Sequence, residues 1–229
     1  MFIQTTPKKV LSVFLTIILC LLVPHLLGLF SKLYLGYGRL LGVIPFFDFG
    51  AEKNLPTLYA SLAILFASAL LAIIGINHKQ AKDRYVLWLL LSAIFFFLSI
   101  DELFSIHEQL VPVMRDKVDA SGYFYFAWVI PYALALLALA VLYFKFLLRL
   151  PKKTMQLFIF SGGLFVMGAI GMEMLGGKIA EVGAHEGVSY ALTYTMEELL
   201  EKLGIAFFIY ALLDYMVEQN GELKFEVTN

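Results

Sequence analysis

The stretch YVLWLLLSAIFFFLSIDELFSIHE, residues 85–108, decides the class of fold that this chain adopts. Its first sixteen residues contain no charged side chain, and about 20 mostly apolar residues suffice to cross a bilayer as a helix. Four ionisable groups follow within the next eight positions: Asp101, Glu102, His107 and Glu108. The stretch therefore predicts a membrane-spanning helix with an acidic cluster at one end.

The composition of the whole chain indicates the same class. Hydrophobic residues make up 61% of its 229 residues, only 15% are charged, and the mean hydropathy is +0.83. A soluble domain is about half apolar and about a quarter charged, so we expect an integral membrane protein in contact with the lipid bilayer. The net charge of −1 gives no reason to expect a nucleic-acid partner. The single cysteine, Cys20, excludes an internal disulfide framework and a CxxC metal site.

Six segments are apolar and long enough to span a membrane, and each is bounded by polar, glycine or proline residues. They are residues 10–30, 57–76, 85–105, 123–147, 155–175 and 190–216. We therefore predict an all-α bundle of six transmembrane helices in one domain, residues 1–217, followed by a short polar tail, residues 218–229. The first segment is too long for the apolar part of an ordinary signal peptide and is read as a helix.

The basic residues predict the orientation of this bundle, because Lys and Arg are enriched in cytoplasmic loops. In a six-span topology three basic groups fall on one side: Lys8 and Lys9; Lys79, Lys82 and Arg84; and Arg149, Lys152 and Lys153. That side, with both chain termini, is predicted to be cytoplasmic. The acidic cluster then lies in the outer half of the bilayer and faces the extracytoplasmic side.

The outer segment that joins the first two spans, residues 31–56, alternates aromatic residues and leucine with glycine. This pattern favours a connector that lies in the membrane interface. A lid over a substrate site is the alternative for the same residues.

Acidic residues from three separate spans are predicted to meet in one layer of the bilayer. At about 1.5 Å of rise per residue, Asp101 lies roughly 24 Å along its helix from the start of the apolar stretch. Glu173 is near the outer end of its own span, and Glu197 and Glu201 lie in the first turns of the span that returns inward. The acids outnumber the permanent cations nearby, so the excess must be protonated, hydrated or bound to cations.

These considerations predict a divalent metal site. The candidate ligands are the carboxylates and imidazoles of the layer: Asp101, Glu102, His107, Glu108, Glu173, His185, Glu197, Glu198 and Glu201. Oxygen ligands suit Mg²⁺, Ca²⁺ or Mn²⁺ and histidine admits Zn²⁺ or Fe, so the sequence leaves the metal open.

Several of these candidates have a simpler alternative role. Glu198 stands four residues before Lys202, so the two can form a local ion pair on one helix. His107, Glu108 and His185 can be solvated residues beyond the bilayer. On a straight helix the four ionisable groups of residues 101–108 point in different directions, and all four can be ligands only if the helix unwinds.

Two motifs carry a resemblance to known proteins. D-E-x4-H-E covers residues 101–108, and E-E-x-x-E-x-x-G covers residues 197–204. In these motifs the chain resembles an uncharacterised family of bacterial polytopic membrane proteins. The resemblance implies a location in the bacterial inner membrane and supports these positions as site residues, and it implies no activity.

Three classes of function fit a buried acidic site. The first is a membrane metalloenzyme acting on a lipid or other hydrophobic substrate, whose metal activates water or oxygen. The second is a divalent-cation or proton-coupled transporter that uses the same carboxylates, and the third is a structural or assembly subunit. Residues 203–213 contain no charge, which argues against a polar path through the membrane and favours a site open only outward. The sequence leaves the substrate and the oligomeric state open.

Overall fold

The computed structural model describes residues 2–39, 42–118, 120–220 and 224–226, and these residues form a helical bundle. Its α-helices are α1 (Pro7–Tyr34), α2 (Val43–Phe47), α3 (Leu55–Gln80), α4 (Val86–Phe104), α5 (Ile106–Val118), α6 (Val129–Leu147), α7 (Lys152–Val166), α8 (Glu173–Glu181) and α9 (Val188–Asn220). The 3-10 helix η2 (Gly122–Phe124) and the π-helix η3 (Met167–Met172) connect some of them. The predicted all-α class is confirmed for these residues, apart from the short antiparallel pair of β1 (Phe2–Gln4) and β2 (Lys224–Glu226).

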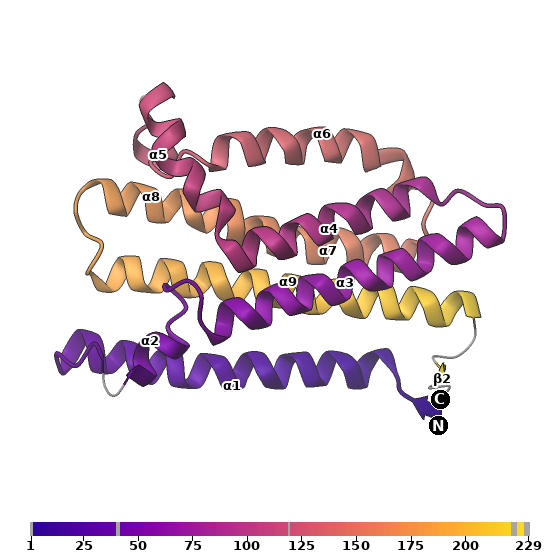
Figure 1. Ribbon diagram of the computed structural model, residues 1–229, viewed down its shortest axis with the longest axis horizontal. Helices are drawn as coiled ribbons and strands as arrows, with labels where there is room; N and C mark the ends of the chain where they lie inside the picture. The colour runs from indigo at the N-terminus through magenta and orange to yellow at the C-terminus, as the bar shows by residue number, and fades with distance from the viewer. Residues whose placement is uncertain (1, 40–41, 119, 221–223, 227–229) are drawn as a thin grey trace.

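Helix α9 is the centre of the bundle. It packs against α1, α3, α7 and α8, and the long helices run side by side along the molecule (Figure 1). Its second half carries many of the most buried side chains, including Ile209, Leu212 and Leu213, which contact the aromatic and aliphatic core around Trp88 and Leu71. Because lipid tails are as apolar as these side chains, close packing against the neighbouring helices, rather than removal from water, holds this half of α9 in place.

Within the described residues, five helical stretches are long and apolar enough to cross a membrane. They are Pro7–Tyr34, Leu55–Gln80, Val86–Phe104, Val129–Leu147 and the continuous run Lys152–Glu181. Their outer faces leave large apolar side chains bare, such as Leu27 at 66% and Val141 at 80% exposure, as lipid contact requires. These five agree with five of the predicted segments and indicate an integral membrane protein. The sixth segment, residues 190–216, lies in α9, where charged residues interrupt the apolar sequence.

The ends of two predicted spans differ from the structure. Residues 123–147 were predicted to be one helix, but α6 begins only at Val129, after η2 and a turn. The span predicted at 155–175 extends over α7, η3 and α8 to Glu181. The π-helical turn within this run widens the helix at Gly168, where it meets α9.

The chain changes direction inside DELFSIHE. Helix α4 ends at Phe104, Ser105 adopts a left-handed conformation with φ 51° and ψ 48°, and α5 begins at Ile106. A non-glycine residue in this region costs roughly 1 kcal/mol or more, so other contacts must hold it. The Ser105 N–H donates to the main-chain oxygen of Asp101, and the Ser105 hydroxyl donates to Glu52. On a straight helix the four ionisable groups of residues 101–108 could not all reach one site, and the helix is interrupted at Ser105.

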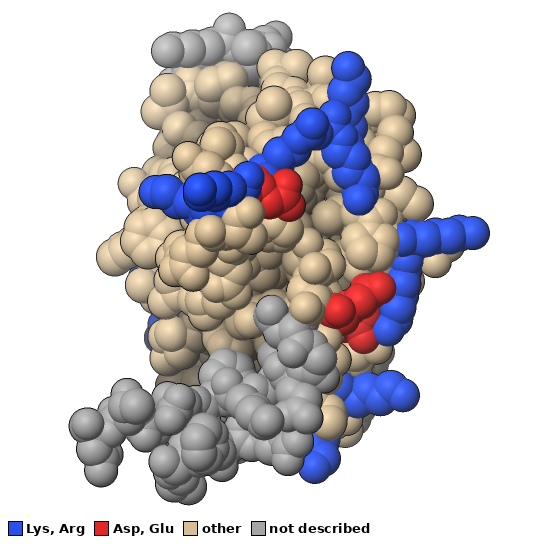
Figure 2. Space-filling model, turned by 90° about the vertical axis from the view of Figure 1, so that its right-hand side faces the viewer, with Lys and Arg blue, Asp and Glu red and all other residues tan. Residues whose placement is uncertain are grey.

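The predicted basic groups gather at one end of the bundle, where both chain ends lie (Figure 1). Figure 2 shows this face, on which blue Lys and Arg side chains far outnumber red Asp and Glu side chains. The exposed bases at the helix ends on this side are Lys8, Lys9, Lys79, Lys82, Arg84, Lys145, Arg149, Lys152 and Lys153. The acidic residues of the predicted site lie toward the opposite end.

Candidate metal centre

A cavity of about 110 Å³ lies between α4, α9 and the η3–α8 segment, and it is acidic. This volume has room for several water molecules. Its acidic lining residues are Glu52, Asp101, Glu102, Glu108, Glu173, Glu197, Glu198 and Glu201. The remaining wall consists of His107, Trp128, Tyr132 and the apolar side chains of Ile64, Leu98, Phe165 and Ala169.

The structure brings together all but one of the residues predicted to be ligands. The exception is His185, which is exposed and whose ring contacts Tyr125 and Tyr190 at centroid distances of 6.4 and 5.6 Å. The sequence reasoning also missed one lining residue, Glu52. Glu52 belongs to the connecting segment between the first two spans, two residues before Asn54 caps α3, and no periodic pattern places such a loop residue.

Asp101 fixes the first residues beyond the helix break. It is only 5% exposed, and its Oδ1 atom accepts a hydrogen bond of 2.8 Å from the main-chain N–H of His107. Its Oδ2 atom accepts one of 3.0 Å from the Tyr132 hydroxyl and lies 3.4 Å from His107 Nδ1. A carboxylate at Nδ1 orients the ring and leaves Nε2 as the nitrogen available to a metal. Asp101 is therefore a supporting group for His107.

Asp101 also controls the charge of the imidazole. Burial disfavours the charged ring, but the hydrogen bond to Asp101 and the charges of Asp101, Glu102 and Glu52 outweigh it and raise the pKa of His107 to about 9. A metal ligand must be the neutral imidazole, so an ion that binds His107 displaces a proton.

Glu52, His107 and Glu108 form a three-residue group at the mouth of the cavity. One ligand atom from each residue lies within 4.8 Å of those of the other two. Tetrahedral ligands at about 2.1 Å from one ion lie about 3.4 Å apart, so side-chain movements of about an ångström would close the group around an ion. At this mouth Glu52 and Glu108 are exposed and His107 is half-buried, and the Ser105 hydroxyl donates to Glu52 Oε2 at 2.9 Å. A second, open hollow beside the group has Glu52 and Glu108 in common with the cavity.

Deeper in the cavity, carboxylates face one another. The indole N–H of Trp128 donates to Glu173 Oε1 at 2.8 Å, and Glu197 lines the same cavity from α9. No hydrogen bond or ion pair involving Glu102 or Glu201 is found among the described residues.

The cations near the cavity are few. Lys202 is 2% exposed and forms an ion pair with Glu198, which confirms the local pair that their spacing allowed. Lys178 is exposed on α8 and donates to the Tyr123 hydroxyl, away from the cavity. In the described part of the chain, Lys202 and a protonated His107 form ion pairs with cavity acids, and Lys53 lines the neighbouring hollow beside Glu52 and Glu108. These three cations are fewer than the eight acids that line the cavity.

Two glycines let the helices around the cavity approach closely. A Cβ atom on Gly168 would lie 2.7 Å from the main-chain oxygen of Glu197 and 2.8 Å from Glu201 Cγ. A Cβ atom on Gly204 would lie 2.7 Å from the main-chain nitrogen of Phe165. Because Gly168 has no side chain, Glu197 and Glu201 lie directly against η3. Single π-helical turns such as η3 are frequent at functional sites.

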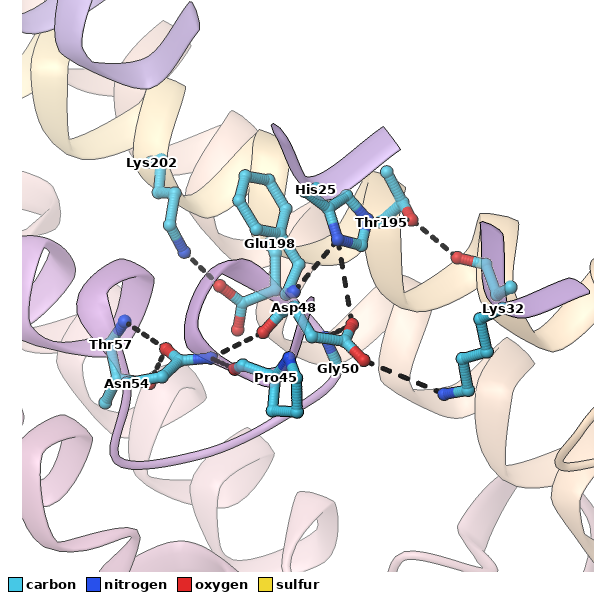
Figure 3. A network of polar contacts seen from close by, with 12 residues as sticks. His25, Lys32, Pro45, Asp48, Gly50, Asn54, Thr57, Thr195, Glu198 and Lys202 are labelled. Atoms are coloured by element: carbon cyan, nitrogen blue, oxygen red, sulfur yellow. Dashed lines mark hydrogen bonds and ion pairs between the residues drawn. The ribbon is translucent and has the colours of Figure 1, made fainter. Parts of the chain in front are cut away.

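The loop of residues 48–54 covers one side of the cavity mouth. It is held by polar contacts from α1, α3 and α9 (Figure 3). The segment 31–56 therefore contributes a residue to the cavity, Glu52, in addition to connecting two helices.

Comparison with known proteins adds a family. The chain matches, over residues 11–215, the family described as a domain of unknown function, DUF8692. The matched range contains every residue that lines the cavity. No curated protein and no solved structure matches the chain. The predicted resemblance to a family without an assigned activity agrees with this result, while the two motifs and a bacterial origin stay predictions.

Proposed function

We propose a metal-dependent function for this chain, which belongs to the DUF8692 family. In this proposal the cavity binds a divalent metal ion and serves a membrane enzyme that acts on a lipid or other hydrophobic substrate. The observation that carries the proposal is the group of Glu52, His107 and Glu108, whose ligand atoms lie within 4.8 Å of one another at the mouth of an acidic cavity.

The uncompensated charge supports a bound cation. Carboxylates in a membrane-embedded bundle are costly, and they usually face a wet cavity and serve a function. Lys202 neutralises Glu198, and Asp101 is satisfied by His107 and Tyr132. The other acids of the cavity have no permanent cation in contact in the described residues, and a divalent ion would lower their mutual repulsion.

The donor set narrows the choice of metal. Two carboxylates and one imidazole suit Mn²⁺, Fe²⁺ or Zn²⁺, whereas Ca²⁺ prefers a larger shell of oxygen atoms. Mg²⁺ and Ca²⁺ would fit the deeper carboxylates better than the mouth. Metal analysis of the purified protein identifies which of these ions it binds.

The surroundings of the group support hydrolytic chemistry. A divalent ion bound there would supply a Lewis acid and an activated water molecule. The neighbouring carboxylates Glu102 and Glu173 could take up the proton, and the apolar wall of Leu98, Phe165 and Ala169 could receive the apolar part of a substrate. An arrangement with polar groups on one side and apolar side chains on the other is typical of small-molecule sites.

The inner end of the cavity favours an enzyme over a transporter. Below Glu201, Gly204 packs directly on α7, and Ile205, Ala206, Phe208 and Ile209 are buried. The next acid on α9, Asp214, is paired with Lys153 at 2.6 Å. Between Lys202 and Asp214 α9 has no charged side chain that could line a path for ions. The transporter and the structural subunit are the alternatives that the experiments below separate from the enzyme.

The proposal includes an orientation. With α9 as a sixth span, both termini and the basic face of Figure 2 are cytoplasmic, since Lys and Arg concentrate on that side. The cavity then opens to the extracytoplasmic side of a bacterial inner membrane. Accessibility of a cysteine introduced at Glu186 to a membrane-impermeant thiol reagent in intact cells, with exposed Cys20 replaced by serine, tests this orientation.

Metal analysis tests the site itself. The purified protein, in phospholipid nanodiscs, is loaded with Mn²⁺, Fe²⁺ or Zn²⁺, and bound metal is measured per chain. We expect stoichiometric binding that is lost in Glu108→Gln and His107→Ala and retained in Glu186→Gln, an exposed acid outside the cavity. Equal metal in all variants, or none in the wild type, overturns the proposal.

Lipid analysis of the same nanodiscs then distinguishes enzyme from transporter. Metal-dependent appearance of a lipid hydrolysis product, absent in Glu108→Gln, is the result expected for the enzyme. Uptake of Mn²⁺ or protons into proteoliposomes without any product would instead assign the carboxylates to transport.

A further inference from the structure

His25 is a buried polar residue in the middle of α1, and it lies outside the set of residues that line the cavity. It is 2% exposed, follows Pro24, and is the one histidine in the first apolar segment. Both of its ring nitrogens have partners: Nε2 lies 2.9 Å from Thr195 Oγ1 on α9, and Nδ1 accepts from the main-chain N–H of Phe49 at 3.1 Å.

The partners determine the state of the imidazole. The Thr195 hydroxyl donates its single proton to the main-chain oxygen of Ala191 at 2.6 Å, so it can only accept from His25. The proton of His25 is then on Nε2, and Nδ1 has the free electron pair that the Phe49 N–H requires. Asp48 Oδ1 lies 3.6 Å from Nδ1, beyond hydrogen-bonding distance, and accepts from Gly50 N–H at 3.0 Å instead. The ring is therefore neutral, and it connects α9 to the loop of residues 48–54.

The loop is stacked as well as hydrogen-bonded at this point. The Phe49 ring lies parallel to the His25 ring, with centroids 4.4 Å apart, and Lys202 Nζ lies 4.9 Å from the centroid of Phe49. Lys202 itself is paired with Glu198 of the cavity. One side of the loop is thus anchored between α1 and Lys202, whose partner Glu198 lines the cavity.

Further contacts of the loop fix the position of Glu52. The Asn54 side chain donates to the main-chain oxygen of Asp48 at 2.6 Å and accepts from the N–H of Thr57 at 3.1 Å, which ties the loop to α3. Gly50 lies so close to Tyr194 that a Cβ atom would be 2.8 Å from its ring. Glu52 is the one cavity acid that does not lie on a helix in the described residues, so its position depends on these contacts and on Ser105.

We propose that His25 is a positioning residue for the metal centre: its Nδ1 bond to the Phe49 N–H holds the loop of residues 48–54 so that Glu52 reaches the metal beside His107 and Glu108. This inference rests on the proposed function, because it assigns Glu52 as a ligand. It makes α1 part of the metal centre although no α1 residue lines the cavity among the described residues.

Two substitutions separate the two nitrogens of His25. In His25→Asn an amide oxygen can take the place of Nδ1 and accept from Phe49, while the bond to Thr195 is lost. In His25→Gln the amide nitrogen can take the place of Nε2 and keep Thr195, while the acceptor for Phe49 is lost. A purely structural role of His25 would make both variants similar, whereas the proposal predicts that only His25→Gln disturbs the loop.

The first measurement needs no metal. Hydrogen exchange of the peptide that contains residues 48–54 is followed by mass spectrometry in nanodiscs. We expect faster exchange in His25→Gln than in the wild type and near-wild-type exchange in His25→Asn. Equal protection of the loop in His25→Gln and the wild type overturns the proposal, whatever the metal results are.

The second measurement is Mn²⁺ affinity, by electron paramagnetic resonance of the free ion. Loss of an outer-shell contact typically weakens metal binding about 10–100-fold, and we expect this for His25→Gln but not for His25→Asn. In the Glu52→Gln background His25→Gln should have no further effect. If the wild type binds no Mn²⁺, Fe²⁺ or Zn²⁺, the proposed function and the role of Glu52 as a ligand both fall. If the wild type binds metal and His25→Gln binds it equally well, only the positioning role falls.

Discussion

The Nδ1 atom of His107 lies 3.4 Å from the Oδ2 atom of Asp101, although the two residues belong to different helices. The left-handed Ser105 between the helices makes this contact possible, because a continuous helix would turn the His107 side chain away from Asp101. The Asp101 carboxylate also accepts the main-chain N–H of His107, so it closes the break from both sides. The geometry of the mouth group therefore depends on one buried acid and one strained serine.

Replacing Asp101 should weaken metal binding without removing a ligand. In Asp101→Asn the side chain keeps one acceptor oxygen and loses the charge that orients the His107 ring, and we expect affinity for Mn²⁺ to fall about 10–100-fold. Tyr132→Phe removes only one donor to Asp101 and is the matched control, with a loss below tenfold. A wild-type dissociation constant for Asp101→Asn would contradict a supporting role for this residue.

Ser105 should respond to the shape of its replacement. Ser105→Gly relieves the left-handed strain but loses the hydroxyl bond to Glu52, so these effects partly cancel and the thermal midpoint in nanodiscs should change little. Ser105→Val places a β-branched residue at φ 51°, and we expect it to destabilise the protein by about 1–3 kcal/mol. A midpoint for Ser105→Val equal to that of Ser105→Gly would show that the strain is released elsewhere.

Gly168 should not tolerate a methyl group. In Gly168→Ala the new Cβ atom would contact the Glu197 oxygen at 2.7 Å, and overpacking of this kind costs about 1–3 kcal/mol. Gly163→Ala on the same helical run is the control, because no atom lies within 4 Å of its Cβ position. We expect the thermal midpoint and the metal content to fall for Gly168→Ala and to stay the same for Gly163→Ala.

The buried pair of Lys202 and Glu198 should be sensitive to removal of one partner. Lys202→Met leaves Glu198 among other acids without its cation, and removing one member of a buried pair typically costs about 3–5 kcal/mol. The double variant Lys202→Met/Glu198→Gln should recover most of this loss, and Lys178→Met, at an exposed position, should have little effect. Denaturation of these four proteins and of the single variant Glu198→Gln in the same detergent measures the differences, and losses of the two single variants that add up in the double variant would argue against a coupled pair.

Much of the fold could be predicted from periodicity and composition. The apolar runs located five helices that are long and apolar enough to span a membrane, because a membrane helix must satisfy its backbone internally and present apolar side chains over its whole length. The helix ends were less predictable. Leu103 and Phe104 continue the apolar pattern, so this pattern does not mark the break that follows. Ser105 is held in its left-handed conformation there by hydrogen bonds to Glu52 and Asp101.

The depth of an acid in the membrane could be predicted only where that acid lies on a helix whose direction is known. Counting residues along the spans predicted one layer for Asp101, Glu173, Glu197 and Glu201, and all four line the cavity. His185, like His107, is followed by a glutamate in the sequence, yet it lies on an exposed turn. His25 could have been singled out, since a lone ionisable group in an apolar span is a signal of function.

By itself, the sequence determined that the chain is a helical membrane protein and that its acids are concentrated in one layer, since both follow from local hydropathy and a fixed rise per residue. Only the tertiary structure decided which groups meet. Glu52 reaches the cavity because His25, Asn54 and Ser105 hold its loop, and His107 turns back because Ser105 breaks the helix. Such contacts join residues far apart in the chain, and hydrogen bonds between distant segments leave no periodic trace in a sequence.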